Sequence, residues 1–204
     1  MRLGLLGPAE DDLDGLAKAA SFMLTGARVD RAIYLGDDDA LEEAVAAWAA
    51  VLVGGDPSDD GVWARAVETA IRGTPVEIDE FLRTERSRQR LRDLERLPRD
   101  GRLSAELFGD RVAVLICDKS QLDEEDILSA TFLIYGKSDV PLAKKIGSRW
   151  FLTPGAIGMQ GGCLVMDDAG DDVIASFYDR NGKLSNEKRL PVPRGTKMRV
   201  QGDS

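Results

Sequence analysis

Residues 130–158 decide how this chain folds, and they read Ala130-Thr-Phe-Leu-Ile-Tyr-Gly-Lys-Ser-Asp-Val-Pro-Leu-Ala-Lys-Lys-Ile-Gly-Ser-Arg-Trp-Phe-Leu-Thr-Pro-Gly-Ala-Ile-Gly158. An apolar run over 130–135 has the length of a buried strand and is broken at Gly136. A second run over 149–153 is broken at Pro154-Gly155. We therefore expect two strands around a polar turn, with any chemistry carried by the turns.

Outward from this unit, apolar runs and helical spacing alternate along the chain. Strands are predicted over 1–7, 29–35, 50–53, 102–107, 111–117, 161–166, 172–178 and 183–190, the last three in a second sheet. Helices are predicted over 9–24, 40–48, 59–72, 77–97 and 124–128. We expect one domain over residues 1–190, with a helical insert at about 58–98 and a flexible tail over 191–204.

Three strand ends carry a recognisable order of turns. The strand 130–135 ends in Gly136-Lys137-Ser138-Asp139-Val140-Pro141, and the strand 149–153 ends in Thr153-Pro154-Gly155-Ala156. An earlier strand ends in Leu35-Gly36-Asp37. This order resembles the calcineurin-like metallophosphoesterases, specifically their small phosphodiesterases, where the corresponding turns are Gly-His-Thr-His before Pro, Asn-Pro-Gly-Ser, and Gly-Asp. The resemblance implies an α/β fold of two packed mixed β-sheets flanked by helices, a metallophosphoesterase-like sandwich.

The same resemblance assigns the family's metal-ligand positions, most of which are substituted here. Asp37 is kept, while the substitutions are Pro8, Glu10, Gly55 (or its neighbour Asp56), Cys117, Lys137 and Asp139. Without the resemblance, the acidic run at Asp37 fits a helix N-cap, and Cys117 fits a small buried hydrophobe. Lys137 stands where a metal ligand would be, so we expect its ammonium within ion-pair distance of Asp37 or Asp139.

Composition excludes several classes of protein. The chain contains no histidine, which removes catalytic triads, imidazole zinc sites and the usual two-metal phosphoesterase site. Its 36 acidic and 27 basic residues give a net charge of -9, so nucleic acid is not an expected partner. No run is long enough for a signal peptide or membrane span, so we expect a cytoplasmic protein without membrane insertion, and reduced thiols at Cys117 and Cys163.

The favoured function is that of a catalytically inactive metallophosphoesterase-fold protein, a protein-interaction or scaffold module without metal or cofactor, for which the retromer subunit of this fold is an analogy. Two alternatives stay open. One is a metal-dependent phosphodiesterase with a histidine-free site, and the other is a binder of a small phosphorylated ligand that does not hydrolyse it. A protein partner is expected, and assembly with further copies of the chain is left open. Two surfaces are candidates for binding it, an arginine-bearing helix and an apolar edge: Arg83, Arg86 and Arg90, or Ile157, Met159 and Phe177.

Overall fold

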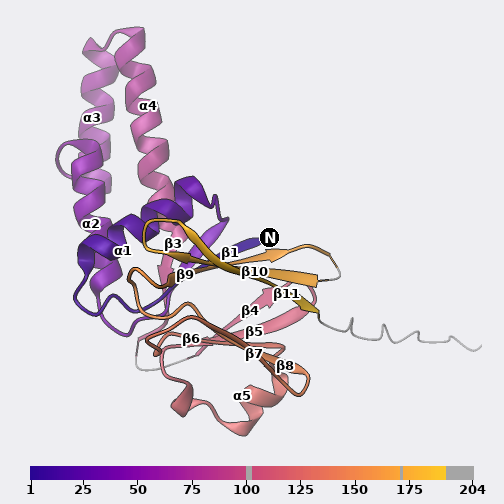
Figure 1. Cartoon of the computed structure of the whole chain (residues 1–204). Helices are drawn as coiled ribbons and strands as arrows, with labels where there is room; N and C mark the ends of the chain where they lie inside the picture. Colours follow the sequence, from indigo (N-terminus) through magenta and orange to yellow (C-terminus); the bar gives the residue numbers. More distant parts are fainter. Residues whose placement is uncertain (100–102, 171, 192–204) are drawn as a thin grey trace, which may run out of the picture.

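The fold is a sandwich of two mixed β-sheets with helices on the outside, as predicted (Figure 1). The computed structural model describes residues 1–99, 103–170 and 172–191. The first sheet has the order β11-β10-β9-β1-β2-β3, with β1 Arg2–Leu6, β2 Arg31–Tyr34, β3 Leu94–Arg96, β9 Gly162–Asp168, β10 Asp172–Asp179 and β11 Leu184–Pro191. The second has the order β4-β5-β6-β8-β7, with β4 Ser104–Phe108, β5 Arg111–Ile116, β6 Phe132–Tyr135, β7 Leu142–Ile146 and β8 Arg149–Thr153.

Helices lie on the outer faces of the sandwich, except for two that project from it. The helices are α1 Leu13–Ser21, continued by a π-helical turn Phe22–Gly26, then α2 Ala40–Val53, α3 Asp59–Arg72, α4 Pro75–Arg90 and α5 Glu124–Ser129, with 3₁₀ turns at Leu91–Asp93 and Lys119–Gln121. Leu16 and Met23 of the first helical segment pack with Leu6 of β1 and Tyr34 of β2. Within the described residues, no helix has the length and apolar character needed to cross a membrane.

The core lies between the two sheets and explains why β1 is apolar on both faces. Leu3 and Leu5 face the second sheet, where they join Leu115, Phe132 and other fully buried side chains. Leu6, by contrast, packs in the cluster beneath α1 and α2. Successive side chains of a strand point to opposite faces, so a strand covered on both sides needs apolar residues at nearly every position.

Several predicted elements are wrong in extent or kind. Residues 50–53 continue helix α2, and the third strand is β3 instead. The helix predicted over 77–97 ends at Arg90. The turn after Tyr135 contains a further strand, β7. The strands after residue 161 extend the sheet that holds β1 and β2, because β9 pairs with β1. Pro191 ends β11, and the rest of the predicted tail lies outside the described residues.

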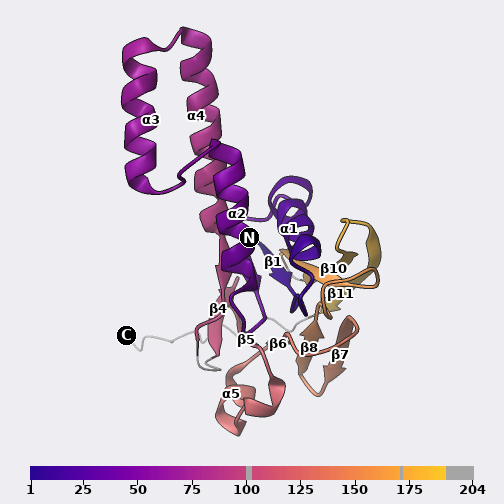
Figure 2. The same ribbon diagram turned by 90° about the vertical axis from the view of Figure 1, so that its left-hand side faces the viewer.

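Helices α3 and α4 form a hairpin that projects away from the sandwich, and we call it the arm (Figures 1 and 2). Its two helices begin at well-formed caps. The Ser58 hydroxyl accepts a hydrogen bond from the Gly61 N–H at 3.2 Å, and Thr74 and Glu77 form a capping box around Pro75. The only buried residues of the arm are Gly61 and Glu85, so its helices are held by little apolar packing.

Candidate functional site

The site predicted from the sequence lies where the carboxyl ends of β2, β5 and β6 meet. The Gly136 N–H donates to the carbonyl oxygens of Ile116 at 3.1 Å and Cys117 at 3.0 Å, which joins the ends of β5 and β6. A Cβ on Gly136 would lie 2.2 Å from the Leu35 carbonyl oxygen at the end of β2. Only glycine permits this approach, so Gly136 brings the two sheets together at this edge.

A pocket of about 390 Å³ opens at this edge. It is lined by Pro8, Glu10, Asp37, Cys117, Asp118, Gln121, Lys137, Ser138 and Asp139. Six of the eight predicted site positions therefore come together in space. Sequence reasoning missed Asp118, Gln121 and Ser138. Asp118 could have been found, because it directly follows the strand end at Cys117.

Gly55 and Asp56 do not belong to this pocket. Helix α2 runs to Val53 and ends at Gly54, whose φ of 66° is left-handed, so the two residues lie in the α2–α3 connection. There the Asp56 carboxylate accepts hydrogen bonds from the Ser58 N–H at 2.9 Å and its hydroxyl at 2.6 Å. These bonds lower the pKa of Asp56, the hydroxyl contributing most. The prediction was wrong because the apolar run 50–53 completes a helix.

Lys137 forms its ion pair with a residue that the sequence did not suggest. Its Nζ lies 2.9 Å from Asp118 Oδ2, and the lysine side chain is 73% exposed. The predicted pair with Asp37 or Asp139 is therefore wrong. The Lys137 ammonium, and then the Ser120 N–H, hold the pKa of the Asp118 carboxyl well below its usual range, while Asp118 raises the pKa of Lys137. Water screens this pair, so it holds the pocket rim together only weakly.

The three acidic residues after β2 have separate surroundings. Asp37 lines the pocket. Asp38 accepts hydrogen bonds from the Tyr34 hydroxyl at 2.9 Å and from the Ala40 N–H at 3.0 Å at the start of α2. Asp39 pairs with Arg99 at 2.9 Å and with Arg96, the last residue of β3. Only the first of the three lines the pocket. Asp39 is the N-cap residue of α2, but its side chain makes no capping hydrogen bond, so the N-cap alternative holds for its position alone.

The Tyr34 hydroxyl positions the loop after β1. It accepts a hydrogen bond from the Ala9 N–H at 3.0 Å, and burial raises the pKa of the phenol, so Tyr34 stays a donor to Asp38. The next two residues, Glu10 and Asp11, have φ values of 46° and 71°, a left-handed backbone that side chains other than glycine adopt only at a cost. This strained loop presents Glu10 to the pocket.

Cys117 is a protonated thiol at physiological pH. Burial, followed by the negative charge of Asp37, raises its pKa to about 11. A thiol becomes a nucleophile or a metal ligand only as the thiolate. Its side chain packs partly against the core between the sheets, as the structural interpretation predicts.

Comparison with known proteins shows which solved structures share this fold. No family model and no curated protein matches the chain. Among solved structures, YfcE, a phosphoesterase from E. coli, is 13% identical, with 93% of this chain and 100% of that chain covered and a TM-score of 0.53. Vps29 from Chaetomium thermophilum is 11% identical, with 95% of this chain and 100% of that chain covered and a TM-score of 0.50. The chain has the metallophosphoesterase fold. At these identities the likeness is one of fold.

The residues present do not fit the metal centre that a metallophosphoesterase fold implies. Such a centre holds its cations with several convergent nitrogen and oxygen ligands. Among the residues that the structure describes, no three His, Cys, Asp or Glu side chains are grouped so that they could hold a metal ion. The pocket instead contains the ammonium of Lys137, the protonated thiol of Cys117 and Pro8, which has no ligand atom.

The two predicted partner-binding surfaces differ in outcome. Arg83, Arg86 and Arg90 are all exposed on α4. The apolar edge does not exist as a surface, because Phe177 is 1% exposed and Ile157 is 7% exposed, both within the core clusters. Met159 alone is open to solvent, at 64%. The alternation of β10 turns Phe177 toward the second sheet, which places it inside the molecule.

Proposed function

We propose that this protein is a catalytically inactive metallophosphoesterase-fold protein that acts by binding another protein. The observation that supports this function is the donor set of the pocket, where no three potential ligands converge among the described residues and a lysine stands at a ligand position. The fold does not choose between functions, because both YfcE, a phosphoesterase, and Vps29 share it.

The pocket disfavours the binding of a small phosphorylated ligand. Its wall carries four carboxylates, from Glu10, Asp37, Asp118 and Asp139, against the single ammonium of Lys137. That ammonium is already paired with Asp118 at 2.9 Å. A phosphate would therefore meet net repulsion unless it displaced an existing ion pair.

The basic face of α4 is the surface that we assign to the partner. Arg83, Arg86 and Arg90 are three and four residues apart, so they lie on one side of the helix, and all three are exposed. Arg90 has one loose contact, with Asp93 of the following 3₁₀ turn at 3.6 Å. In a chain of net charge -9, this local basic stripe favours an acidic protein surface.

One experiment tests the loss of catalysis. We expect no heat of Mn²⁺ binding in calorimetry and no hydrolysis of bis(p-nitrophenyl) phosphate with Mn²⁺ present. Hydrolysis that disappears in Asp37→Ala, but persists in the surface control Glu125→Ala, would show an active metal site and overturn the proposal.

A second experiment tests the binding surface. The chain carrying Arg83→Glu and Arg86→Glu should lose its co-purifying partner, and the wild-type interaction should weaken as salt concentration rises. The control is Lys144→Glu, which reverses an exposed charge on β7 and should retain the partner. If the arginine variant retains the partner as well as the control does, the assignment to α4 is wrong.

A further inference from the structure

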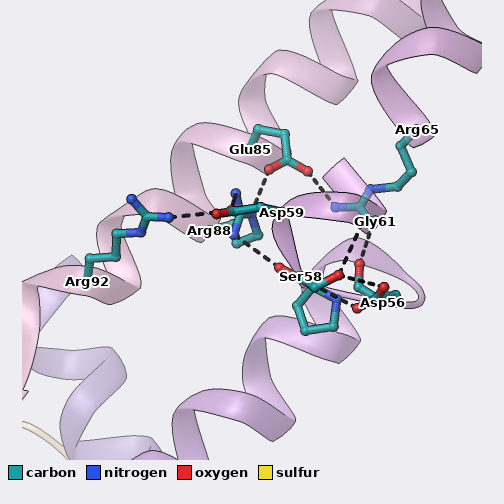
Figure 3. Close-up of polar contacts among 9 residues, drawn as sticks. Asp56, Ser58, Asp59, Gly61, Arg65, Glu85, Arg88 and Arg92 are labelled. Carbon is teal, nitrogen blue, oxygen red and sulfur yellow. Dashed lines mark hydrogen bonds and ion pairs between the residues drawn. The ribbon is translucent and has the colours of Figure 1, made fainter. Parts of the chain in front are cut away.

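The contact between the two helices of the arm is unusually polar (Figure 3). Glu85 is 8% exposed, and its carboxylate accepts hydrogen bonds from Arg65 of α3 at 2.8 Å and from Arg88 of α4 at 2.7 Å. Arg88 also donates to the Pro57 carbonyl at 3.1 Å and lies 3.8 Å from Asp59. These contacts hold α3 against α4 through charge at the base of the arm.

Three large apolar residues of α3 lie on its exposed side, whereas Val62 and Ala66 are half-buried. Trp63, Val67 and Ile71 follow one another at intervals of four residues, so they form one stripe along the helix, and they are 71%, 55% and 75% exposed. We call these three residues the α3 stripe. An amphipathic helix normally turns such residues toward its partner helix and its charges toward water. Here Arg65 faces α4 and the tryptophan faces solvent, which indicates that a further surface covers the stripe.

The charges on α3 make the stripe complementary to itself. Its first turn is acidic, with Asp59 and Asp60, and its last turn is basic, with Arg72. In the part of the chain that the structure describes, neither Asp60 nor Arg72 takes part in an ion pair. Two copies of α3 packed antiparallel about a two-fold axis at Val67 would place each acidic turn beside the other copy's basic turn. The same axis would place Trp63 of each copy against Ile71 of the other.

We propose that the α3 stripe is the interface of a homodimer in which two copies of this chain pack their α3 helices antiparallel. Such an interface is isologous and closes at two copies. The arm stands clear of the sandwich in both views, so the two sandwiches lie apart (Figures 1 and 2). A parallel pairing would bring the acidic turns together. The dimer does not depend on the proposed function, because the basic stripe of Arg83, Arg86 and Arg90 is on the other helix.

Oligomeric state tests this interface directly. Light scattering and sedimentation of the full chain should give a dimer, and Val67→Glu should give a monomer because it places two carboxylates at the axis. The control is Leu128→Glu on α5, where the leucine is 68% exposed, and this variant should stay dimeric. Circular dichroism checks that both variants fold. A monomeric wild-type chain, or a Val67→Glu variant that stays dimeric, would overturn the proposal.

The antiparallel arrangement has its own test. Asp60→Arg and Arg72→Asp should each weaken dimerisation by roughly two- to fivefold, and the double variant should restore it. Both crosslinking experiments use a Cys117→Ser background. A short bis-maleimide should crosslink two copies of the Val67→Cys variant. When the Trp63→Cys and Ile71→Cys variants are mixed, it should crosslink one copy of each. Efficient linking of Trp63→Cys to itself would instead show a parallel pair and refute this arrangement.

Discussion

At the scale of single residues, the candidate site shows how neighbouring charges set chemistry. Cys117, Asp118 and Lys137 line one pocket, yet the thiol is held protonated while the carboxylate and ammonium are held charged. The difference arises because the thiol is partly buried beside Asp37, whereas Asp118 is bonded to a cation and a backbone N–H. The pocket is therefore rich in ionisable groups and poor in reactive ones.

Cys117 should react slowly with iodoacetamide. With a pKa of about 11, its thiolate fraction at pH 8 predicts alkylation roughly a hundredfold slower than that of free cysteine. Asp37→Asn removes a charge that raises this pKa, so the variant should react faster. Peptide mass spectrometry separates Cys117 from buried Cys163. Alkylation at the rate of free cysteine would contradict the assigned protonation state.

The pair between Asp118 and Lys137 should give a pH-dependent contribution to stability. The pKa of Asp118 is lower in the folded state, so its contribution is complete above the ordinary value of about 4 and is lost as pH falls through the folded value. Asp118→Asn should lower the Tm slightly at pH 7, by an amount that stays constant down to about pH 4 and shrinks below it. Lys137→Ala should show the same pH dependence of its Tm in thermal melts from pH 2 to 8. A loss of Tm relative to the wild type that grows as the pH falls would contradict this.

At the scale of elements, the limits of some helices could be predicted from the sequence, whereas one strand could not. Helix α3 has the predicted limits, because Ser58 and Gly73 mark both ends. The short apolar run 50–53 fits a strand and a helix equally well, and only its continuation from Ala40 decides. Strand β3 has three residues, two of them charged, and it exists because it pairs with β2. That pairing is long-range and leaves no local pattern, so the third strand end of the site could not be placed.

Because both faces of β10 are partly buried, the sequence did not show which of its side chains face the core. A strand with one exposed face alternates between apolar and polar residues, which shows which side is inside. In β10, Val173, Ala175 and Phe177 face the core and Ser176 is also buried, so the alternation is weak. The sequence therefore identified the strand and misplaced Phe177 on the surface.

Gly136→Ala should weaken the contact between the two sheets. The new Cβ would lie 2.2 Å from the Leu35 carbonyl oxygen, which is backbone and moves only with β2. We expect a loss of about 1–3 kcal/mol, or more, in the free energy of unfolding from urea titration. Gly55→Ala is the matched control, since nothing lies within 4 Å of its added Cβ. Equal stability of the two variants would mean that the close approach at Gly136 is not required.

At the scale of the whole molecule, the arm and the sandwich differ in how they are stabilised. The sandwich buries large apolar side chains between its sheets, whereas the arm buries only Gly61 and Glu85. Local opening costs least where apolar contacts are fewest. The arm should therefore open without the sandwich, so its stability depends on the ionic contacts of Glu85 and on whatever covers the α3 stripe.

Hydrogen exchange should separate these two parts. At low protein concentration, amides of α3 and α4 should exchange well before those of β1 and β9. Glu85→Ala leaves Arg65 and Arg88 without their shared acceptor and should cost the arm about 1–3 kcal/mol, seen as faster exchange in α3 and α4 only. Glu80→Ala, at an exposed position of α4, is the control. Faster exchange in the sheets would show that the arm and sandwich unfold together.

The pairing of β2 with β3 shows that the sandwich does not need the arm to connect these two strands. Ala32 pairs with Leu94, so the chain leaves the sheet and returns to it at neighbouring positions, and α2 alone is long enough to make that crossover. Helices α3 and α4 are thus an insertion in the connection between α2 and β3. Lengthening this insertion by whole helical turns, changing its charges or exchanging it for another should therefore leave the strand pairings of the sandwich in place.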